Sequence, residues 1–335
     1  MTMSIAAALL FLGTLGILAL GGWVSRYAFP SMALLPGVLL ILIGVELRPR
    51  FGRVNRTLWT VNRADAPGLF ALLDRTAEAA GVRPPQIVQV DTVFTASITV
   101  VGIRRRRVLL LGPPLWASLP PQQRVAVLGH EFGHFRNGDP RRGLLVQPAY
   151  RTLATLADLF RPYGRHEFRG PVGFLVNLVL GVLSGLALAG QIALTAIGQR
   201  EVQRAEYLAD EIAARVAGSV AIIGALKTAL LKDVLVPSLA RVARAGESGP
   251  AWLAAAEHSR AAMAGDLPAR SQLSVRDEAS LFADHPPTGL RIRMLEARPA
   301  YAAKAVLTEA EAARIDEELK PFYERCRRDL AHSNF

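Results

Sequence analysis

The segment His130–His134 reads His-Glu-Phe-Gly-His and constrains this chain more than any other feature. On an α-helix, residues four positions apart lie on one face, so both imidazoles can reach one metal ion. Glu131 follows the first histidine, where it can accept a proton from a water molecule that the metal activates. The pattern predicts a helix that carries half of a zinc site, and the rest of the chain must supply a third ligand.

The flanking residues predict where this helix begins and ends. Ser118–Pro121 is typical of a helix start, because prolines are tolerated in the first turn, where N–H groups lack helical partners. Asn137 and Gly138 form a natural left-handed C-cap, and Pro140 cannot continue the helix. We expect a helix from about Pro120 to Asn137. Its inward-facing residues are Val125, Leu128, Phe132 and Phe135.

A second helical segment, ending near Gly218, offers the third ligand. Glu206 and Asp210 are four residues apart and share one face of it. Glu206 can complete a set of two histidines and one glutamate, and Asp210 can accept the outer ring N–H of a ligating histidine. The alternative is a solvated acidic face paired with Arg204 or Arg215. We favour the ligand interpretation because the pair follows a His-Glu-x-x-His motif.

Three blocks resemble the HtpX and type I CAAX prenyl protease family of integral-membrane zinc metallopeptidases. The first is His130–His134, and the second is Arg204–Asp210, with the sequence Arg-Ala-Glu-Tyr-Leu-Ala-Asp. The third is Phe282–Ile292, which contains the family pattern His-Pro-x-x-x-x-Arg-Ile. The blocks occur in family order, and the resemblance covers residues 60–300.

The resemblance implies an α+β, predominantly helical fold: a zincin-type metallopeptidase domain with a small sheet, plus transmembrane helices. It implies one Zn²⁺ per chain, bound by His130, His134 and Glu206. Glu131 would be the general base, His285 would assist transition-state stabilisation, and Arg291 would brace the site near Asp210. From the residues alone, a single histidine in a proline-rich loop is most often a surface residue.

A β-hairpin is predicted by the alternation in Val93–Val101 and Arg107–Leu111, with its turn around Gly102. An edge strand of this kind can bind an extended peptide by backbone pairing. The residues expected to contact substrate are Val93, Phe94, Thr95, Ala96 and Ser97. The family often has Asn-Ala-Phe before this strand, whereas residues 92–94 are Thr-Val-Phe, so an asparagine contact is absent. The alternative is an ordinary core hairpin.

Three uncharged apolar runs, in a chain that is 51% hydrophobic, predict membrane segments. They are Ile5–Gly22, Ala28–Val45 and the glycine-rich Pro171–Gln199. No basic residue precedes the first run and no small-x-small cleavage site follows it, so we interpret it as a retained anchor. A buried helix of a soluble protein is the alternative for the third run.

The positions of the arginines predict which side of the membrane the catalytic domain faces. The loop between the first two runs carries only Arg26, whereas the second run is followed by Arg48, Arg50, Arg53, Arg56 and Arg63. Positively charged loops remain cytoplasmic, so the catalytic domain is expected to face the cytoplasm. This basic juxtamembrane segment is also expected to contact anionic lipid.

The metal ligands flank the third run, so the chain must cross the membrane twice or not at all between them. Leu144–Phe160 is a candidate partner span, although it carries two charged residues. The connecting segment Arg161–Arg169 would then place three arginines outside, against the usual bias. A short hairpin within Pro171–Gln199 and an interfacial helix are the alternatives. We favour four membrane segments.

We divide the chain into four parts. Residues 1–57 hold two spans and the basic segment, and residues 58–143 hold the first half of the peptidase domain, with a helix closed by Gly81 and a strand at Gln86–Val90. Residues 144–199 are membrane-associated, and residues 200–335 hold the second half. Within that half, Asp233–Asp266 is interpreted as a mobile insertion between helices. Thr308–Glu311 is a capping box that opens a helix to about Arg328.

The net charge of +11 raises nucleic acid as a partner, but the basic tip Arg104–Arg107 lacks interleaved aromatic residues. We therefore expect no nucleic-acid binding; a lipid contact or a solvated turn explains the tip. Cys326 is the only cysteine, which excludes an intramolecular disulfide and a cysteine zinc site.

The resulting hypothesis is a zinc endopeptidase of the cytoplasmic membrane that cleaves membrane or misfolded proteins. A role in quality control is implied only by the resemblance. The alternative is a non-proteolytic or latent membrane regulator that retains a zinc site. Prenyl-protein processing would need more spans than the sequence shows.

Overall fold

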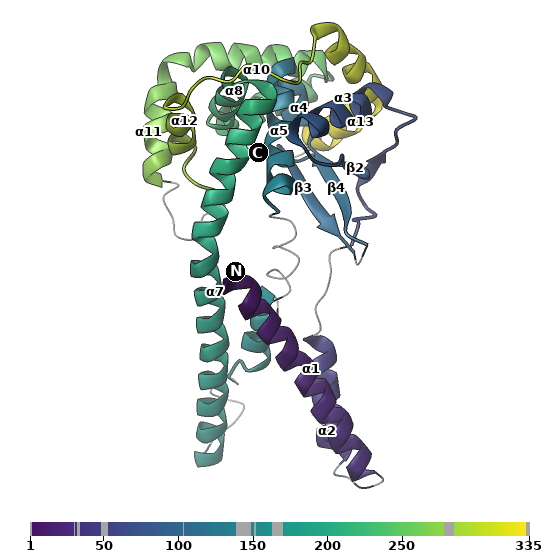
Figure 1. Cartoon of the computed structure of the whole chain (residues 1–335), viewed down its shortest axis with the longest axis vertical. Helices are drawn as coiled ribbons and strands as arrows, with labels where there is room; N and C mark the ends of the chain where they lie inside the picture. Colours follow the sequence, from purple (N-terminus) through teal and green to yellow (C-terminus); the bar gives the residue numbers. More distant parts are fainter. Residues whose placement is uncertain are drawn as a thin grey trace. The chain divides into compact units, whose positions relative to one another are not determined.

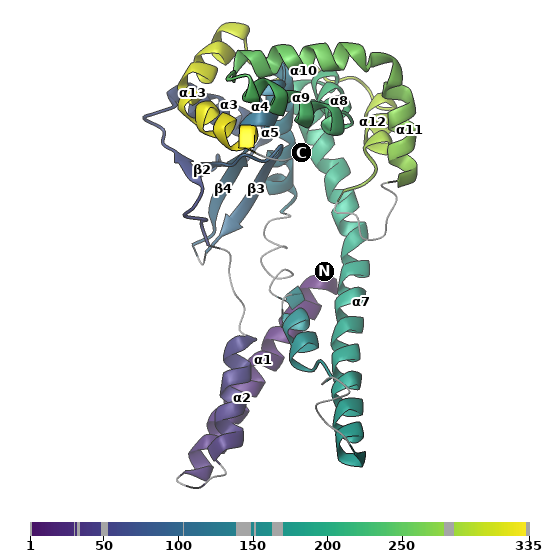
Figure 2. The ribbon, with the colours of Figure 1, turned by 180° about the vertical axis from the view of Figure 1, so that it is seen from behind.

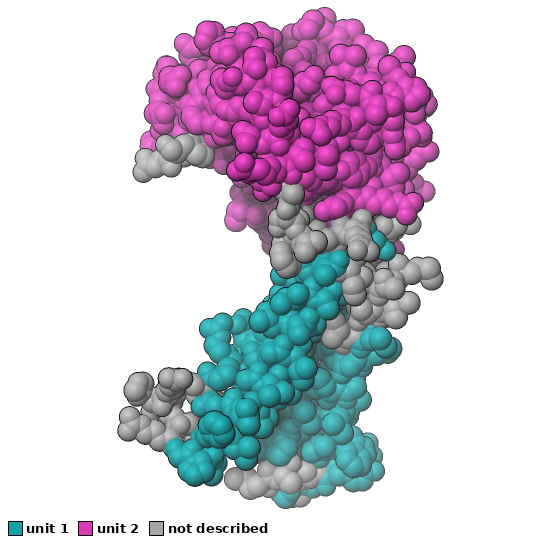
Figure 3. All heavy atoms as spheres, turned by 90° about the vertical axis from the view of Figure 1, so that its left-hand side faces the viewer, with its two compact units in different colours: residues 1–51, 141–201 teal, residues 52–140, 202–335 magenta. Residues whose placement is uncertain are grey.

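The computed structural model describes residues 2–29, 31, 34–47, 53–102, 104–138, 149–150, 152–162, 170–277 and 285–332. The chain divides into two compact units, each built from two separate stretches of sequence (Figure 3). Unit 1 contains residues 1–51 and 141–201, and unit 2 contains residues 52–140 and 202–335. Helix α7, Pro171–Ala217, begins in the first unit and ends in the second.

Unit 1 is helical and exposes apolar side chains. Helices α1, Thr2–Ala28, and α2, Leu34–Glu46, pack closely, because a Cβ on Gly21 would lie 2.9 Å from the carbonyl oxygen of Gly37. Leucines 9, 12 and 15 of α1 are more than 60% exposed. Apolar surface of this extent on a helix pair is typical of a lipid-facing segment.

The third apolar run lies in α7, which is 47 residues long. Among the residues that the structure describes, α7 is the one helix that is both long and apolar enough to span a membrane, and α2 is a shorter apolar helix. The expected partner span Leu144–Phe160 is described only in part, with a helix at residues 152–159. Arg48, Arg50 and residues 144–148, 163–169 and 281–284 lie outside the described residues.

Unit 2 contains a four-stranded mixed sheet with the order β1-β2-β4-β3 (Figure 1). Its strands are β1 (Trp59–Val61), β2 (Ile87–Val90), β3 (Ala96–Val101) and β4 (Arg106–Leu111). β2 and β4 are parallel, and the outer strands are antiparallel to their neighbours. The predicted hairpin is confirmed as β3 and β4, but β3 begins at Ala96 and not at Val93. Gly112 N–H donates to Thr95 O, and Thr95 N–H donates to Val93 O, so residues 93–95 form a turn before the strand.

The predicted helices of the first half are confirmed within a few residues. α3 spans Pro67–Ala80 and is closed by Gly81 at φ 71°, and α5 spans Pro121–Asn137 and is closed by Gly138 at φ 78°. Ser118 instead ends a separate short helix, α4, Pro113–Ser118. The C-terminal helix α13, Glu309–His332, begins with the predicted capping box, because Glu311 N–H donates to Thr308 Oγ1 and Thr308 N–H donates to Glu311 Oε2.

The interpretation of Asp233–Asp266 as a mobile insertion is wrong. Helices α8 (Ser219–Ala229), α9 (Lys232–Arg244), α10 (Pro250–Ala262) and α11 (Leu267–Asp277) fill this part of unit 2 and precede α12 (Thr288–Glu296). Trp252 and Leu239 are buried in the main core, which explains why the segment is ordered despite its Pro and Gly residues. In both views α11 and α12 lie at the side of unit 2 away from the sheet (Figures 1 and 2).

A buried ion pair joins α5 to α13. Arg124, which is 1% exposed, donates through both terminal nitrogens to Asp316, at 2.7 and 3.1 Å. Its Nε donates to Leu119 O, and the hydroxyl of Tyr323 donates to the same carboxylate at 2.7 Å. Each polar group has a partner, which is the condition for a buried charge to be tolerated.

Replacing Asp316 with Ala leaves the Arg124 guanidinium buried without a counter-charge. We expect Asp316→Ala to lower the free energy of unfolding by about 3–5 kcal/mol. The neighbouring Glu317 carries a 74% exposed side chain paired with Lys320, so Glu317→Ala should cost about 0–1 kcal/mol. Urea unfolding of the detergent-solubilised variants measures both changes. Equal losses of unfolding free energy in the two variants would contradict a stabilising role for the buried Arg124–Asp316 pair.

Candidate metal centre

Helix α5 presents both histidines toward one point. His130 Nε2 and His134 Nε2 are 3.2 Å apart, and their rings meet edge to face at 86°. Phe132 is fully buried on the opposite side of this turn. The helical spacing therefore directs the imidazoles out of the core while the residue between them anchors the helix.

Helix α7 brings Glu206 to the same point. Glu206 Oε1 lies 3.3 Å from His134 Nε2, and Glu206 Oε2 lies 3.6 Å from His130 Nε2. The carboxylate is only 3% exposed. Burial alone would raise its pKa, but contacts with His134 and His285 outweigh burial and keep the pKa of Glu206 below its usual value.

These three side chains fit a zinc ion. One ligand atom from each lies within 4.8 Å of the others. A tetrahedral zinc ion with ordinary bond lengths separates its ligand atoms by about 3.3 Å, and the three distances above bracket that value. Two imidazoles and one carboxylate also form the protein donor set typical of a catalytic zinc site, which leaves a fourth position open.

Glu131 is buried beside the ligands, with 9% of its surface exposed. Burial raises the pKa of this carboxyl, while the neighbouring histidines oppose the shift. A carboxylate with a raised pKa is a stronger proton acceptor than one in water.

Asp210 links His130 to Arg291. Its Oδ1 lies 2.9 Å from His130 Nδ1 and 2.7 Å from Arg291 Nη2, and its Oδ2 accepts a hydrogen bond from Arg291 Nε at 2.7 Å. Asp210 is fully buried, which alone would raise its pKa, yet the bonds from Arg291 lower it. The carboxylate therefore remains charged and can fix His130 with its proton on Nδ1, which leaves Nε2 for the metal.

His285 also reaches the site. It lies before α12, and its Nδ1 is 2.9 Å from Glu206 Oε2, although 62% of its side chain is exposed. Arg291 lies in α12 and is 8% exposed. The seven site residues predicted from the three blocks are thus together in unit 2, while Phe282–Asp284 lie outside the described residues.

Two glycines of α5, which the sequence analysis missed, allow this convergence. A Cβ on Gly133 would lie 2.7 Å from Ala209 Cα, and one on Gly129 would lie 3.2 Å from Ala213 Cα. Asn137 Nδ2 also donates to Ala205 O. The available signal was a pair of small residues four apart on each helix, Gly129 and Gly133 facing Ala209 and Ala213.

The predicted substrate strand lies at the edge of the sheet and contacts α5. Of the five residues named for it, Ala96 and Ser97 belong to β3. Val93, Phe94 and Thr95 instead line a hollow of about 330 Å³ against α9 and the end of α13.

A set of two partly buried histidines and a buried glutamate, with a second glutamate following the first histidine, defines the class of metal-dependent peptidases. The sequence profile of peptidase family M48 matches residues 66–299, and the chain belongs to this family. It is a metallopeptidase, and M48 peptidases are zinc enzymes.

Curated proteins that are similar to this chain at low sequence identity support the family assignment. A protease HtpX homolog from Pyrococcus abyssi is 26% identical over 238 residues, covering 70% of this chain and 74% of the relative. A protease HtpX homolog from Acidiphilium cryptum is 24% identical over 280 residues, covering 83% and 90%. Protease HtpX from Stutzerimonas stutzeri is 28% identical over 171 residues, covering 48% and 55%. No solved structure matches the chain significantly.

The close approach at Gly133 can be tested. We expect Gly133→Ala to separate α5 from α7, to destabilise unit 2 by about 1–3 kcal/mol and to weaken zinc binding by about tenfold. Gly129→Ala should have a smaller effect, because its Cβ would meet its neighbours at 3.2 Å and not at 2.7 Å. Chelator competition and thermal unfolding measure both properties.

Gly265→Ala is the control, because a Cβ there has no atom within 4 Å. Zinc affinity unchanged in Gly133→Ala would show that the helix contact does not position the ligands.

Proposed function

We propose that this chain is a membrane-anchored zinc endopeptidase that uses Glu131 as its general base. The observation that supports it most is the convergence of His130, His134 and Glu206 at tetrahedral spacing, with Glu131 buried beside them. A site that bound zinc only for stability would not need this additional buried carboxylate.

In this proposal His130, His134 and Glu206 hold one zinc ion, and Asp210 orients His130. When bound, zinc supplies Lewis-acid activation of water and of the scissile carbonyl group. Glu131 accepts the proton of the attacking water and delivers it to the nitrogen of the departing amine. Burial excludes bulk water from Glu131, so the proton remains with this carboxyl between the two transfers.

The roles of His285 and Arg291 differ. Arg291 donates through Nε and Nη2 to Asp210 and lies 3.5 Å from Glu206 through Nη1, so its guanidinium is already paired with two carboxylates and braces Asp210. His285 is exposed, and its Nδ1 lies 2.9 Å from the outer oxygen of Glu206. We therefore assign His285 as the donor to the oxyanion that develops on the substrate carbonyl.

The substrate is a protein or peptide segment in extended form. β3 is an edge strand, and its outer edge can pair with such a segment through backbone hydrogen bonds. We place Ala96 and Ser97 on this pairing edge. Recognition by the backbone would suit an enzyme that cleaves unfolded chains of varied sequence.

The membrane anchor consists of α1, α2 and the apolar part of α7 in this proposal. The arginines that follow α2 favour a cytoplasmic peptidase unit and contacts with anionic lipid. Quality control of membrane proteins is the role that the resemblance to HtpX proteases suggests.

The mechanism predicts separable effects at the site. Glu131→Gln should retain one zinc per chain and lose activity by a factor of at least 10³, because the shape remains while the base is lost. His134→Ala and Glu206→Ala should lose zinc as well as activity. Zinc content by elemental analysis and cleavage of unfolded casein by the detergent-purified, zinc-loaded chain measure the two properties.

Glu257→Gln is a suitable control, because this carboxylate is exposed on α10. Normal turnover by Glu131→Gln would rule out its role as base. Failure of the wild-type chain to cleave any unfolded protein would instead favour a latent or regulatory zinc protein.

The orientation predicts which sites an impermeant thiol reagent reaches. Cys326 is buried and can be replaced by Ser, after which His332→Cys reports on unit 2 and Phe29→Cys on the loop between α1 and α2. In intact spheroplasts we expect labelling of Cys at position 29 alone. At position 332 labelling should require permeabilisation, and the reverse pattern would contradict the proposed topology.

A further inference from the structure

Two hollows of unit 2 share a wall. The hollow at residues 92–95 and a larger cavity of about 1050 Å³ are both lined by Lys232 and Val236 of α9. The first hollow begins where β3 begins, so the two together extend from the end of the edge strand into the helical part of the unit. A peptide that is paired with β3 and continues past Ala96 therefore reaches the wall formed by Lys232 and Val236.

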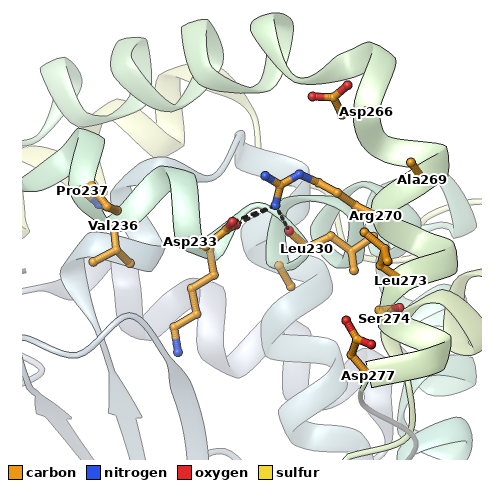
Figure 4. Close-up of a pocket in the computed structure, with 12 residues that line it drawn as sticks. Leu230, Asp233, Val236, Pro237, Asp266, Ala269, Arg270, Leu273, Ser274 and Asp277 are labelled. Atoms are coloured by element: carbon orange, nitrogen blue, oxygen red, sulfur yellow. Dashed lines mark hydrogen bonds and ion pairs between the residues drawn. The ribbon is translucent and has the colours of Figure 1, made fainter.

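The larger cavity lies between α9 and α11 (Figure 4). Arg270 of α11 crosses it and donates to the carboxylate of Asp233 at 2.8 and 2.9 Å and to Leu230 O at 3.3 Å. Figure 4 shows this guanidinium between the two helices, with Leu273 on one wall and Val236 on the other. The ion pair links the two walls and pairs two of the five charged residues of the lining; the other three are Lys232, Asp266 and Asp277.

The cavity is also joined to the catalytic residues through α11. Ser274, which lines the cavity, accepts a hydrogen bond from Gly289 N–H of α12 at 2.8 Å. A Cβ on Gly289 would lie 2.1 Å from Ser271 O, so the two helices touch through backbone. α12 carries Arg291, and the cavity wall is therefore rigidly connected to the helix that braces the metal site.

We propose that this cavity binds bulky apolar side chains on the C-terminal flank of the substrate. The inference rests on the proposed peptidase function and on pairing of the substrate with β3. A peptide antiparallel to β3 directs its C-terminal end toward residues 92–95, because the strand runs from Ala96 to Val101. Beyond that turn the hollows lead to α9 and α11.

The lining combines charged residues with an apolar surface that fits apolar side chains. Leu273 is 49% exposed although it faces a cavity, and Val236 and Pro237 add apolar surface opposite it. The volume is at the upper limit of ordinary ligand pockets, so it accommodates more than one side chain. A hydrophobic segment exposed by unfolding has this chemistry, whereas the surface of a folded soluble protein does not.

Paired peptides test the proposal in the full-length, zinc-loaded chain. An eight-residue fluorogenic peptide is compared with the same peptide extended at its C-terminus by Leu-Phe-Leu-Phe or by Ser-Gly-Ser-Gly. We expect the apolar extension to raise kcat/KM about tenfold over the polar one. Leu273→Asp should abolish this preference and leave cleavage of the unextended peptide within about twofold of wild type.

Each cavity variant has a matched control. Val220→Asp changes an apolar residue of α8 that is 86% exposed and is outside the cavity lining, so the preference should remain. Ala269→Trp places an indole in the cavity without adding charge and should also reduce the preference, whereas Ala262→Trp on α10 should not. Thermal unfolding confirms that each variant is folded.

Binding separates this inference from the proposed activity. In the Glu131→Gln background, fluorescence anisotropy of a labelled apolar-extended peptide should show a Kd raised about tenfold by Leu273→Asp and Ala269→Trp only. Equal Kd values in all variants would overturn the cavity assignment. Retained binding preference without any cleavage by the wild-type chain would instead contradict the endopeptidase function.

Discussion

The backbone contact between α5 and α7 is the constraint on which the site depends. Gly133 faces Ala209 at a distance that leaves no room for a larger side chain. On α5, Gly133 lies between His130 and His134, and on α7, Ala209 lies between Glu206 and Asp210. Ordinary helix pairs are separated by 8–10 Å, and only small residues permit closer approach. Because imidazole and carboxylate side chains are short, a wider separation would place the ligand atoms too far apart for one metal ion.

The same contact concentrates negative charge in a dry environment, and Arg291 compensates for it. Glu131, Glu206 and Asp210 are all buried within one site. Arg291 pairs with Asp210 through two nitrogens and lies 3.5 Å from Glu206 through a third. A divalent metal ion bound by these ligands would balance the remaining negative charge.

The sequence predicted the local elements whose signals are strong and local. The proline start and glycine end of α5, the capping box of α13 and the hairpin of β3 and β4 were read within a few residues. The helices between Lys232 and Asp277 were not predicted because their glycines and prolines are typical of loops. Burial of Trp252 and Leu239 in the core stabilises these helices through contacts with residues distant in sequence. The glycine contact of α5 was missed for the same reason, since only the partner helix shows that Gly133 needs to be small.

The division of unit 2 into two stretches of sequence has a consequence for biosynthesis. The ribosome adds His130 and His134 before residues 141–201 of unit 1. It adds Glu206, His285 and Arg291 after them. Domains fold as units during synthesis, starting from the N-terminus. The metal centre is therefore incomplete while the apolar part of α7 is being made, and the nascent chain carries no assembled peptidase until its last segment has emerged.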